Sequence, residues 1–293
     1  MGQAVDGQGV AEPVGARTGL VARRHVVITG AASGIGRATA ERLAADGHRL
    51  TLVCRPGTET RLAPLAKAGA AVVGCDLSRP REVARLAARL VAEGGAVDVL
   101  FCNAGVQPWR RERTPEGLEL GFAVNVLAAY VLVRDSLPSL RRSSAPLVLV
   151  TGSLVEAWGA VRLDDLQSAR DFDPNRAYWT QKLAVLQLVH HFAGLYRDAG
   201  IAVHAIEPGM TRTAFARHFR GFYRFMSIVW RPFMRRPEAV AAEIAALISR
   251  ADLLETTGTN WHRGRPKQPS AAATDAVAAR ALAEACERLA AVG

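Results

Sequence analysis

Short runs of apolar residues alternate along the chain with longer stretches in which apolar residues recur every three or four positions. A short run bounded by turn residues is typical of a buried strand, and the longer periodicity is typical of a helix. The predicted strands are residues 25–29, 49–54, 71–75, 97–102, 147–150, 201–206 and 260–262. Strands that alternate with helices are usually parallel, so the pattern predicts an α/β fold, a doubly wound parallel sheet of about seven strands with helices on both faces.

Helix starts are marked by polar capping residues. Ser78 is the expected N-cap of a helix that runs to about Glu93. Thr114, followed by a proline, predicts the start of a long helix towards Leu137, and Asp173 before another proline repeats this signature. We expect all of these strands and helices to form a single domain.

The folded domain is expected at residues 23–293. Residues 1–22 show neither the strand pattern nor the helix pattern and are typical of a mobile N-terminal leader. The longest clearly hydrophobic uncharged stretch, residues 120–133, contains Asn125 and is shorter than the roughly 20 residues of a membrane span. The four cysteines have neither C-x-x-C spacing nor nearby histidines, so we expect reduced core thiols, no metal site and a cytoplasmic protein.

The net charge of +10 is unusual, with 37 basic residues against 27 acidic ones, and only three of the basic residues are lysines. Such an excess can indicate nucleic acid, an anionic membrane surface or a phosphate-bearing ligand. The chain contains no recognised nucleic-acid-binding module, so we expect no nucleic-acid partner. The location of the basic residues must distinguish between an anionic membrane surface and a phosphate-bearing ligand.

A glycine-rich turn follows the first predicted strand and precedes a helix. Its pattern is Gly30-x-x-x-Gly34-x-Gly36. Glycine allows the backbone to turn tightly and approach a pyrophosphate, and unpaired N–H groups at the start of the helix attract the anion. A strand before and a helix after the turn favour dinucleotide binding in a Rossmann fold.

The end of the second predicted strand favours NADP over NAD. A NAD site usually has an acidic residue there, which accepts hydrogen bonds from the ribose 2′-hydroxyl. This strand instead ends at Arg55, and the first acidic residue is Glu59. Arg55, and Arg37 from the glycine turn, can bind a 2′-phosphate. The alternative is that both arginines are solvated surface charges in an arginine-rich protein.

Tyr178 and Lys182 are four residues apart on a predicted helix, so their side chains lie on one face. An ammonium close to a phenol stabilises the phenolate and lowers its pKa, which suits a tyrosine that exchanges protons. A Tyr-x-x-x-Lys pair is also common by chance, so its context decides its meaning.

That context is a set of polar and glycine-containing segments at or beside the carboxyl ends of predicted strands, where open α/β sheets bind ligands. The segments are residues 102–105, 124–126, 151–153 and 208–213. With the glycine turn and the tyrosine-lysine pair, they resemble the short-chain dehydrogenase/reductase family from about Arg24 to the C-terminus. Cys102 and Gly152 stand where that family often has Asn and Ser. The pattern is most similar to the retinol dehydrogenase-like branch.

The resemblance implies a catalytic tetrad of Asn125, Ser153, Tyr178 and Lys182. Tyr178 would exchange the hydroxyl proton, Lys182 would lower the pKa of Tyr178 and bind the nicotinamide ribose, Ser153 would bind the substrate oxygen, and Asn125 would hold a water. The residues implied in NADP(H) binding are Gly30, Ser33, Gly34, Ile35, Gly36, Arg37, Arg55, Asp76, Leu77, Asn103, Ala104, Gly105, Tyr178, Lys182, Pro208, Gly209, Thr211 and Thr213.

Residues 215–236 contain seven of the 18 aromatic residues, six arginines and no acidic residue. By its place after the Pro208-Gly209 turn, segment 214–236 resembles the substrate lid of the family, and its aromatic character suits an apolar substrate. The same composition suits weak contact with an anionic membrane surface. The alternative is a helix that packs on the domain with its arginines in water.

We therefore predict an NADP-dependent oxidoreductase that acts on a carbonyl or alcohol of a lipophilic small molecule. A non-catalytic NADP(H)-sensing protein with the same fold is the alternative, although a sensor needs no proton relay. The family resemblance further implies a homodimer or homotetramer built on the helices that carry Asn125 and Tyr178, and the basic segment adds peripheral membrane location to the cytoplasmic expectation.

Overall fold

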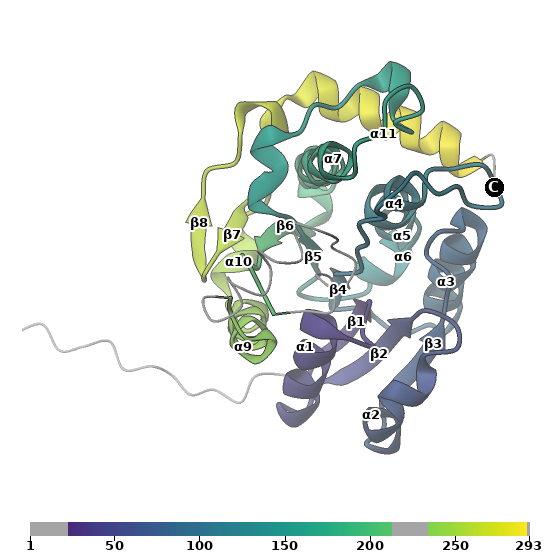
Figure 1. The fold of residues 1–293 in the computed structure, drawn as a ribbon. Helices are drawn as coiled ribbons and strands as arrows, with labels where there is room; N and C mark the ends of the chain where they lie inside the picture. The colour runs from purple at the N-terminus through teal and green to yellow at the C-terminus, as the bar shows by residue number, and fades with distance from the viewer. Residues whose placement is uncertain (1–22, 213–233, 292–293) are drawn as a thin grey trace, which may run out of the picture.

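The computed structural model describes residues 23–212 and 234–291. Within these ranges the chain forms one eight-stranded sheet of order β3-β2-β1-β4-β5-β6-β7-β8, in which each pair is parallel except β7 with β8 (Figure 1). The strands are β1 His25–Thr29, β2 Arg49–Cys54, β3 Ala71–Gly74, β4 Val99–Cys102, β5 Leu147–Thr151, β6 Ala202–Glu207, β7 Asn260–His262 and β8 Arg265–Lys267. The doubly wound α/β prediction and the seven predicted strands are confirmed.

Helices cover both faces of the sheet (Figure 1). Helices α1 (Gly34–Ala45) and α9 (Pro237–Ile248) pack together on one face, and α3 (Pro80–Ala92), α5 (Ala128–Asp135) and α7 (Pro174–Leu195) cover the other. The shorter helices are α2 Ala63–Lys67, α4 Leu120–Phe122, α6 Leu137–Leu140 and α10 Asp252–Glu255, and α11 spans Ala276–Ala291. Because both faces are covered, the central strands are buried on both sides, which explains their unbroken apolar runs.

Two helix starts differ from the prediction. Helix α3 starts one residue later than expected, with Arg79 at the N-cap, because the Ser78 hydroxyl donates instead to Asp76 Oδ1 (2.7 Å). Thr114 does not start a helix: its N–H donates to the Leu118 carbonyl (2.8 Å), and a turn with Gly117 at φ +83° follows. The predicted N-cap at Asp173 is confirmed, since its carboxylate accepts the N–H groups of the next helical turn.

The helix that Thr114 was expected to open begins at Leu120. Glu119 is its N-cap, and its carboxylate accepts hydrogen bonds from the N–H groups of Gly121 and Phe122. The helix widens into a π-helical turn at Ala123–Leu127 before it continues as α5. Asn125 lies in this widened turn, and π turns inside helices frequently mark functional sites.

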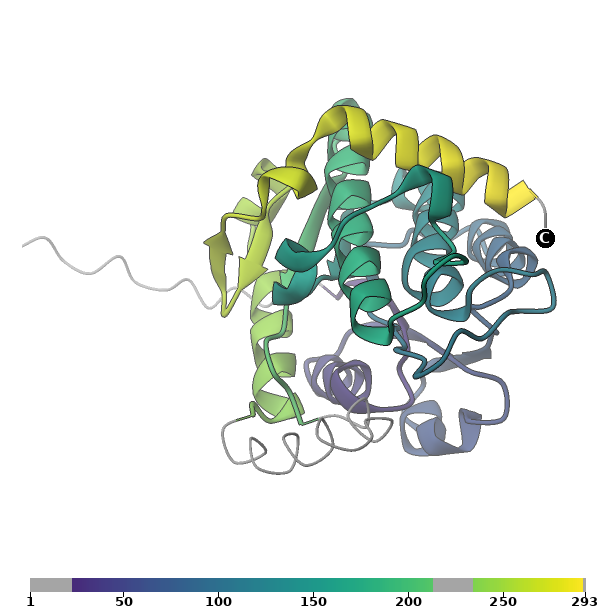
Figure 2. The ribbon, with the colours of Figure 1, turned by 45° about the horizontal axis from the view of Figure 1, so that its top comes forward.

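The C-terminal segment covers the outer side of α7 and α5. A 3₁₀ turn at Ala271–Thr274 leads into α11, which packs on both helices (Figures 1 and 2). Tyr130 of α5 donates a hydrogen bond to Glu287 (2.9 Å), and the buried side of α11 carries Leu282 and Cys286. Any association through the outer face of α5 and α7 would therefore have to include α11 or displace it. The homodimer or homotetramer stays a prediction.

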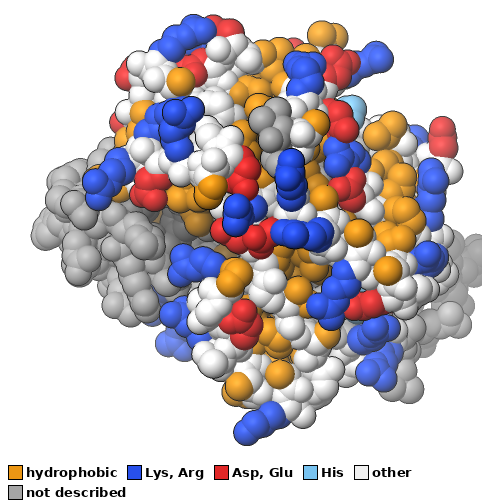
Figure 3. All heavy atoms as spheres, turned by 90° about the vertical axis from the view of Figure 1, so that its right-hand side faces the viewer, with side chains coloured by type: hydrophobic (Ala, Val, Ile, Leu, Met, Phe, Trp, Pro, Cys, Tyr) orange, Lys and Arg blue, Asp and Glu red, His pale blue; other side chains and the backbone are white. Residues whose placement is uncertain are grey.

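Charge is dispersed where the structure describes it. On the face shown in Figure 3, Lys and Arg side chains alternate with Asp and Glu side chains. Several arginines pair with acidic residues one helical turn away, such as Arg42 with Asp46 (2.8 Å) and Arg89 with Glu93 (3.0 Å). Among residues 23–212 and 234–291, no helix is long and apolar enough to cross a membrane. The predicted leader and residues 214–233 of the predicted lid lie outside the described residues.

Candidate active site

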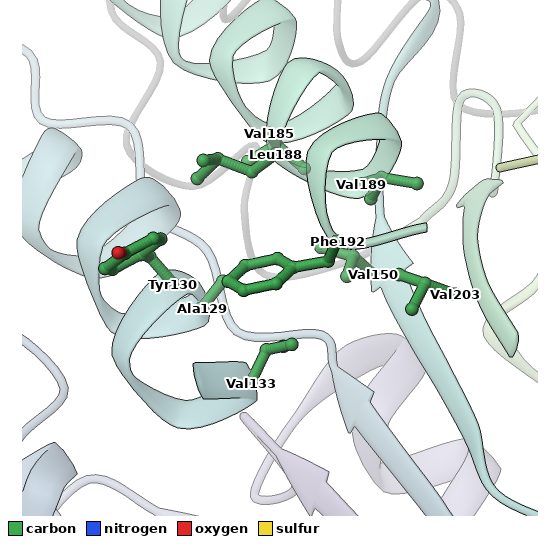
Figure 4. Close-up of a pocket in the computed structure, with 9 residues that line it drawn as sticks. All are labelled: Ala129, Tyr130, Val133, Val150, Val185, Leu188, Val189, Phe192 and Val203. Carbon is green, nitrogen blue, oxygen red and sulfur yellow. The ribbon is translucent and has the colours of Figure 1, made fainter. Parts of the chain in front are cut away.

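The carboxyl ends of β1, β4 and β5 meet at a small pocket. Its lining includes Thr29, Leu77, Ala104, Asn125 and Thr151, so the structure brings together segments that the sequence predicted to meet. A second pocket, shown in Figure 4, lies deeper between α5 and α7 and is lined by apolar side chains around Phe192. Asn125 lines the first pocket, and Lys182 donates a hydrogen bond to the carbonyl oxygen of Thr151, which lines it as well.

The glycine turn packs tightly against the segment after β4. Gly30 has φ +68°, and a Cβ added to Gly36 would lie 2.5 Å from both the Gly30 carbonyl oxygen and Asn103 Nδ2. Asn103 Nδ2 donates to the Thr29 carbonyl (2.9 Å), and the Thr29 hydroxyl accepts the N–H groups of Asn103 and Ala104. Thr29, which the sequence reasoning did not select, thus joins the two loops. A threonine directly before the first glycine was the available signal.

The start of α1 fits a phosphate. Its N-cap, Ser33, is exposed and extended, its side chain makes no capping hydrogen bond, and the first turn carries no acidic residue. The N–H groups of Gly34, Ile35 and Gly36 therefore have no partner within the helix, as at the anion-binding helix starts of dinucleotide-binding folds. Together with the close glycine backbone, these residues suit a pyrophosphate.

Two tetrad residues, Ser153 and Lys182, lie close to the third, Tyr178. Ser153 is the N-cap of a 3₁₀ turn at Leu154–Trp158 directly after β5, and its hydroxyl is hydrogen-bonded to the phenol of Tyr178. Lys182 lies one turn further along α7, with Nζ 5.7 Å from the centroid of the Tyr178 ring. Its ammonium donates to the carbonyl oxygen of Thr151 (2.7 Å). The i,i+4 spacing thus places both side chains towards the end of β5.

Burial dominates the protonation of this pair. It raises the pKa of Tyr178, and the hydrogen bond from Ser153 opposes this shift only in part. Burial lowers the pKa of Lys182 to about 8, because a buried ammonium loses its hydration. Burial thus outweighs the hydrogen bond in setting the pKa of Tyr178, and a lowering of that pKa by Lys182 stays a prediction. At neutral pH the phenol holds its proton.

Asn125, the fourth residue, is buried and contacts the segment that follows β4. Its Oδ1 accepts the N–H of Val106 (2.7 Å), and its Nδ2 donates to the Val106 carbonyl (2.7 Å) and to Gln181 Oε1 (2.7 Å). A Cβ built on Gly105 would lie 3.3 Å from Asn125 Oδ1 and 4.0 Å from Lys182 Nζ. Asn125 and Lys182 therefore both lie close to Gly105, near the position that a Cβ would take.

The two arginines assigned to a 2′-phosphate differ. Arg37 is engaged in an ion pair with Glu41 (2.8 Å) on the exposed side of α1, as the surface-charge alternative expects. Arg55 is exposed at the end of β2 and forms no ion pair within the described residues. Arg55 is thus the better placed of the two.

The remaining predicted cofactor residues within the described ranges lie at two loops. Asp76 and Leu77 follow β3, and Asp76 Oδ1 accepts hydrogen bonds from both the N–H and the hydroxyl of Ser78. Pro208, Gly209 and Thr211 follow β6, where the Thr211 hydroxyl donates to the Gly209 carbonyl (3.1 Å). Thr213 lies outside the described residues.

Buried acidic residues that the sequence reasoning missed support these loops. Glu207, fully buried at the end of β6, accepts hydrogen bonds from Lys267 (2.8 Å) and Asn260 (2.6 Å) beneath the Pro208-Gly209 turn. Glu156, in the 3₁₀ turn that Ser153 caps, accepts from the N–H and the hydroxyl of Ser270. The rarity of lysine was the one signal for Lys267. Nothing local marked the acidic residues.

Comparison with known proteins agrees with the fold and the motifs. Residues 30–263 match the family model described as enoyl-(acyl carrier protein) reductase. The chain belongs to the short-chain dehydrogenase/reductase family, a family of oxidoreductases.

Two mammalian relatives are retinol dehydrogenases. Retinol dehydrogenase 13 of Homo sapiens is 29% identical over 272 residues, which cover 88% of this chain and 82% of that protein. Retinol dehydrogenase 14 of Mus musculus is 31% identical over 220 residues, covering 70% of this chain and 66% of the relative. The resemblance to the retinol dehydrogenase-like branch is consistent with these matches.

Solved structures are similar over most of the chain. A crystal structure of a putative uncharacterized protein from Mycobacterium paratuberculosis has a TM-score of 0.70 at 26% identity, covering 92% of this chain and 94% of that one. An alcohol dehydrogenase from the archaeon Thermococcus sibiricus, complexed with 5-hydroxy-NADP, has a TM-score of 0.62 at 25% identity, covering 85% and 99%. One similar fold has therefore been seen with an NADP derivative bound.

Proposed function

We propose that this protein is an NADP(H)-dependent oxidoreductase that interconverts a carbonyl and an alcohol on a lipophilic small molecule. The observation that carries the proposal is the hydrogen bond between Ser153 and a protonated Tyr178, with Lys182 beside the ring. These groups lie at the strand ends next to the phosphate-compatible start of α1. Such an arrangement can bind a carbonyl oxygen and give it a proton.

Each residue of the tetrad has a distinct role in this proposal. Tyr178 donates the proton to the substrate oxygen in reduction and removes it in oxidation. Ser153 donates a hydrogen bond to the same oxygen, Lys182 stabilises the phenolate that Tyr178 leaves behind, and Asn125 holds the Val106 peptide at the edge of the site. The cofactor would supply or accept the hydride at its nicotinamide ring.

The cofactor would lie across the strand ends. The N–H groups of Gly34, Ile35 and Gly36 would bind the pyrophosphate, and Arg55 would bind the 2′-phosphate that distinguishes NADP from NAD. The absence of an acidic side chain at the end of β2 supports this choice, since a carboxylate there would repel the phosphate.

A lipophilic substrate is supported by exposed apolar side chains beside the catalytic residues. Leu154 directly follows Ser153, and Trp158, which is 66% exposed, contacts Trp179 next to Tyr178 (ring centroids 5.5 Å apart). Met210 in the loop after β6 is also exposed. The names of the retinol dehydrogenase relatives and the aromatic composition of residues 214–236 point in the same direction, and peripheral membrane contact through that segment is part of the proposal.

Replacement of Tyr178 by phenylalanine separates this function from NADP(H) sensing. Tyr178→Phe removes the transferable proton but leaves the ring, so NADPH should bind with an affinity within about threefold of wild type. The rate of NADPH oxidation with a panel of apolar aldehydes should fall at least about 1,000-fold, from the lost proton transfer.

NADPH fluorescence measures the binding and absorbance at the nicotinamide band measures the turnover. Tyr196→Phe, which removes the same hydroxyl from a buried tyrosine at the other end of α7, controls for loss of a phenol group as such. Binding of NADPH without turnover in wild type would support the sensor instead, and unchanged turnover in Tyr178→Phe would refute the assigned role.

A further inference from the structure

A chain of buried polar side chains leads from the start of α4 to the segment after β4. Glu119, Gln181 and Asn125 are each at most 5% exposed. Gln181 Nε2 donates to Glu119 Oε2 (2.8 Å), Asn125 Nδ2 donates to Gln181 Oε1 (2.7 Å), and Asn125 then binds both the N–H and the carbonyl of Val106. The chain crosses between two helices, because Gln181 belongs to α7 and the other two flank or occupy the α4 segment.

The carboxylate determines the direction of every hydrogen bond in this chain. When ionised, Glu119 can only accept, and its oxygens already accept the N–H groups of Gly121 (2.8 Å) and Phe122 (2.6 Å). Gln181 must therefore turn its NH₂ group towards Glu119 and its oxygen towards Asn125. Asn125 in turn has to present its NH₂ group to Gln181, which leaves its oxygen for the N–H of Val106.

Close packing around Gln181 keeps its side-chain amide in this orientation. A Cβ added to Gly121 would lie 2.7 Å from Gln181 Nε2 and 2.9 Å from its Oε1. The amide plane thus packs directly against the backbone of α4. Any larger residue at position 121 would displace the amide, and the amide itself has little room to move away from the carboxylate.

The far end of the chain lies at the catalytic lysine. Val106 directly follows the segment 103–105 that is expected to line the cofactor, and a Cβ added to Gly105 would lie 3.3 Å from Asn125 Oδ1 and 4.0 Å from Lys182 Nζ. Gln181 also precedes Lys182 on α7. A turn of the Asn125 amide would therefore release the Val106 peptide, which directly follows the glycine close to the lysine.

We propose that Glu119 and Gln181 are positioning residues that lock the orientation of the Asn125 amide and, through it, the Val106 peptide beside Lys182. Neither residue touches the reacting atoms. Their effect on catalysis rests on the proposed function, but their effect on Val106 is a property of the protein alone. A buried polar network of this kind must be fully satisfied to hold one geometry.

Hydrogen exchange of the Val106 amide, measured by NMR on the full chain without cofactor, tests directly whether Glu119 and Gln181 fix the Asn125 amide and the Val106 peptide. Gln181→Leu removes the middle of the chain, and Glu119→Gln keeps its shape but replaces an acceptor by a group with an NH₂. Both should speed exchange at Val106 by about tenfold or more, the effect of losing one buried hydrogen bond. Gln187→Leu is the matched control, because Gln187 is equally buried on α7 but donates to Ala272 (2.9 Å) instead.

Thermal unfolding establishes that each variant is folded, and the isosteric Glu119→Gln carries the test if Gln181→Leu does not fold. Exchange at Val106 within twofold of wild type in the folded variants would overturn the proposal. So would an equal increase in Gln187→Leu, because that result would show general loosening.

Steady-state kinetics and NADPH binding then test whether this positioning of Asn125 affects catalysis. In Glu119→Gln the turnover number should fall about tenfold while the NADPH dissociation constant changes less than threefold, since small displacements near reacting groups affect the rate most. A fall in affinity alone would contradict a role in catalytic alignment. If wild type shows no turnover, the proposed function fails, and the exchange measurement still decides whether the lock exists.

Discussion

Two opposing effects act on the pKa of the Tyr178 phenol. Removal of water around the phenol raises its pKa, and the hydrogen bond from Ser153 lowers it by a smaller amount. Lys182 loses hydration as well, so its pKa falls to about 8, which still leaves the amine mostly protonated at neutral pH. Single side chains here are governed by their surroundings, and spacing along a helix cannot specify those surroundings.

The choice of cofactor is a property of single residues at the end of β2. Arg55→Asp replaces an exposed guanidinium by a carboxylate, which would repel a 2′-phosphate and accept hydrogen bonds from a ribose 2′-hydroxyl. We expect kcat/KM for NADPH to fall about 10- to 100-fold and kcat/KM for NADH to rise, as measured by initial rates with both cofactors.

Arg197→Asp provides the same change of charge at an exposed position before the start of β6, at the opposite edge of the parallel sheet from the end of β2. It controls for the loss of positive charge as such. Equal losses in the two variants, or a wild type that prefers NADH, would contradict NADP recognition by Arg55.

At the scale of elements, the C-terminal segment is tied to the turn that begins at the catalytic serine. Glu156 lies three residues after Ser153 and is 1% exposed, and its two carboxylate oxygens accept the N–H (3.0 Å) and the hydroxyl (2.6 Å) of Ser270. Ser270 in turn caps the 3₁₀ turn before α11. A contact between residues 114 apart in sequence thus connects α11 to the loop that holds Ser153.

Ser270→Ala should weaken this connection. The buried carboxylate of Glu156 keeps one donor and loses the other, which costs about 1–3 kcal/mol of unfolding free energy. Urea unfolding measures the change. Thr274→Ala, in the same 3₁₀ turn but exposed, should cost less than about 0.5 kcal/mol. Equal costs in the two variants would show that the Glu156 contact adds no stability.

At the scale of the whole molecule, α11 covers α5 and α7 and shields them from solvent. Its Leu282 side chain is fully buried, and Tyr130 and Phe192 beneath it form an aromatic contact (ring centroids 5.5 Å apart). Without α11 these helices would expose an apolar surface, and such surfaces promote association. The position of α11 therefore bears on both the stability and the assembly of the protein.

Leu282→Ala should lower the free energy of unfolding by about 2–5 kcal/mol, because it leaves a cavity under α11. Light scattering should detect more self-association than in wild type as the helix loosens. Val277→Ala on the same helix, where the side chain is 81% exposed, should change neither quantity appreciably. A loss of stability below about 1 kcal/mol would contradict tight packing of α11.

The features that the sequence predicted correctly depend on local pattern. Strands buried on both faces appear as continuous apolar runs, and Asp173 is an N-cap because its side chain can reach the N–H groups two and three residues ahead. The i,i+4 spacing of Tyr178 and Lys182 likewise follows from helical geometry alone. Strand β8 was missed because three residues that consist of a proline between two basic residues carry no strand pattern.

By itself, the sequence determined the order of the elements, the glycine turn and the one face of α7 that bears Tyr178 and Lys182. Only the tertiary structure decided that Thr114 forms a turn while Glu119 caps the helix, that burial raises the pKa of Tyr178, and that Gln181 connects Glu119 to Asn125. The physical reason is distance along the chain. Hydrogen bonds between residues 56 and 62 positions apart, and the loss of water around a phenol, exist only after the elements have packed.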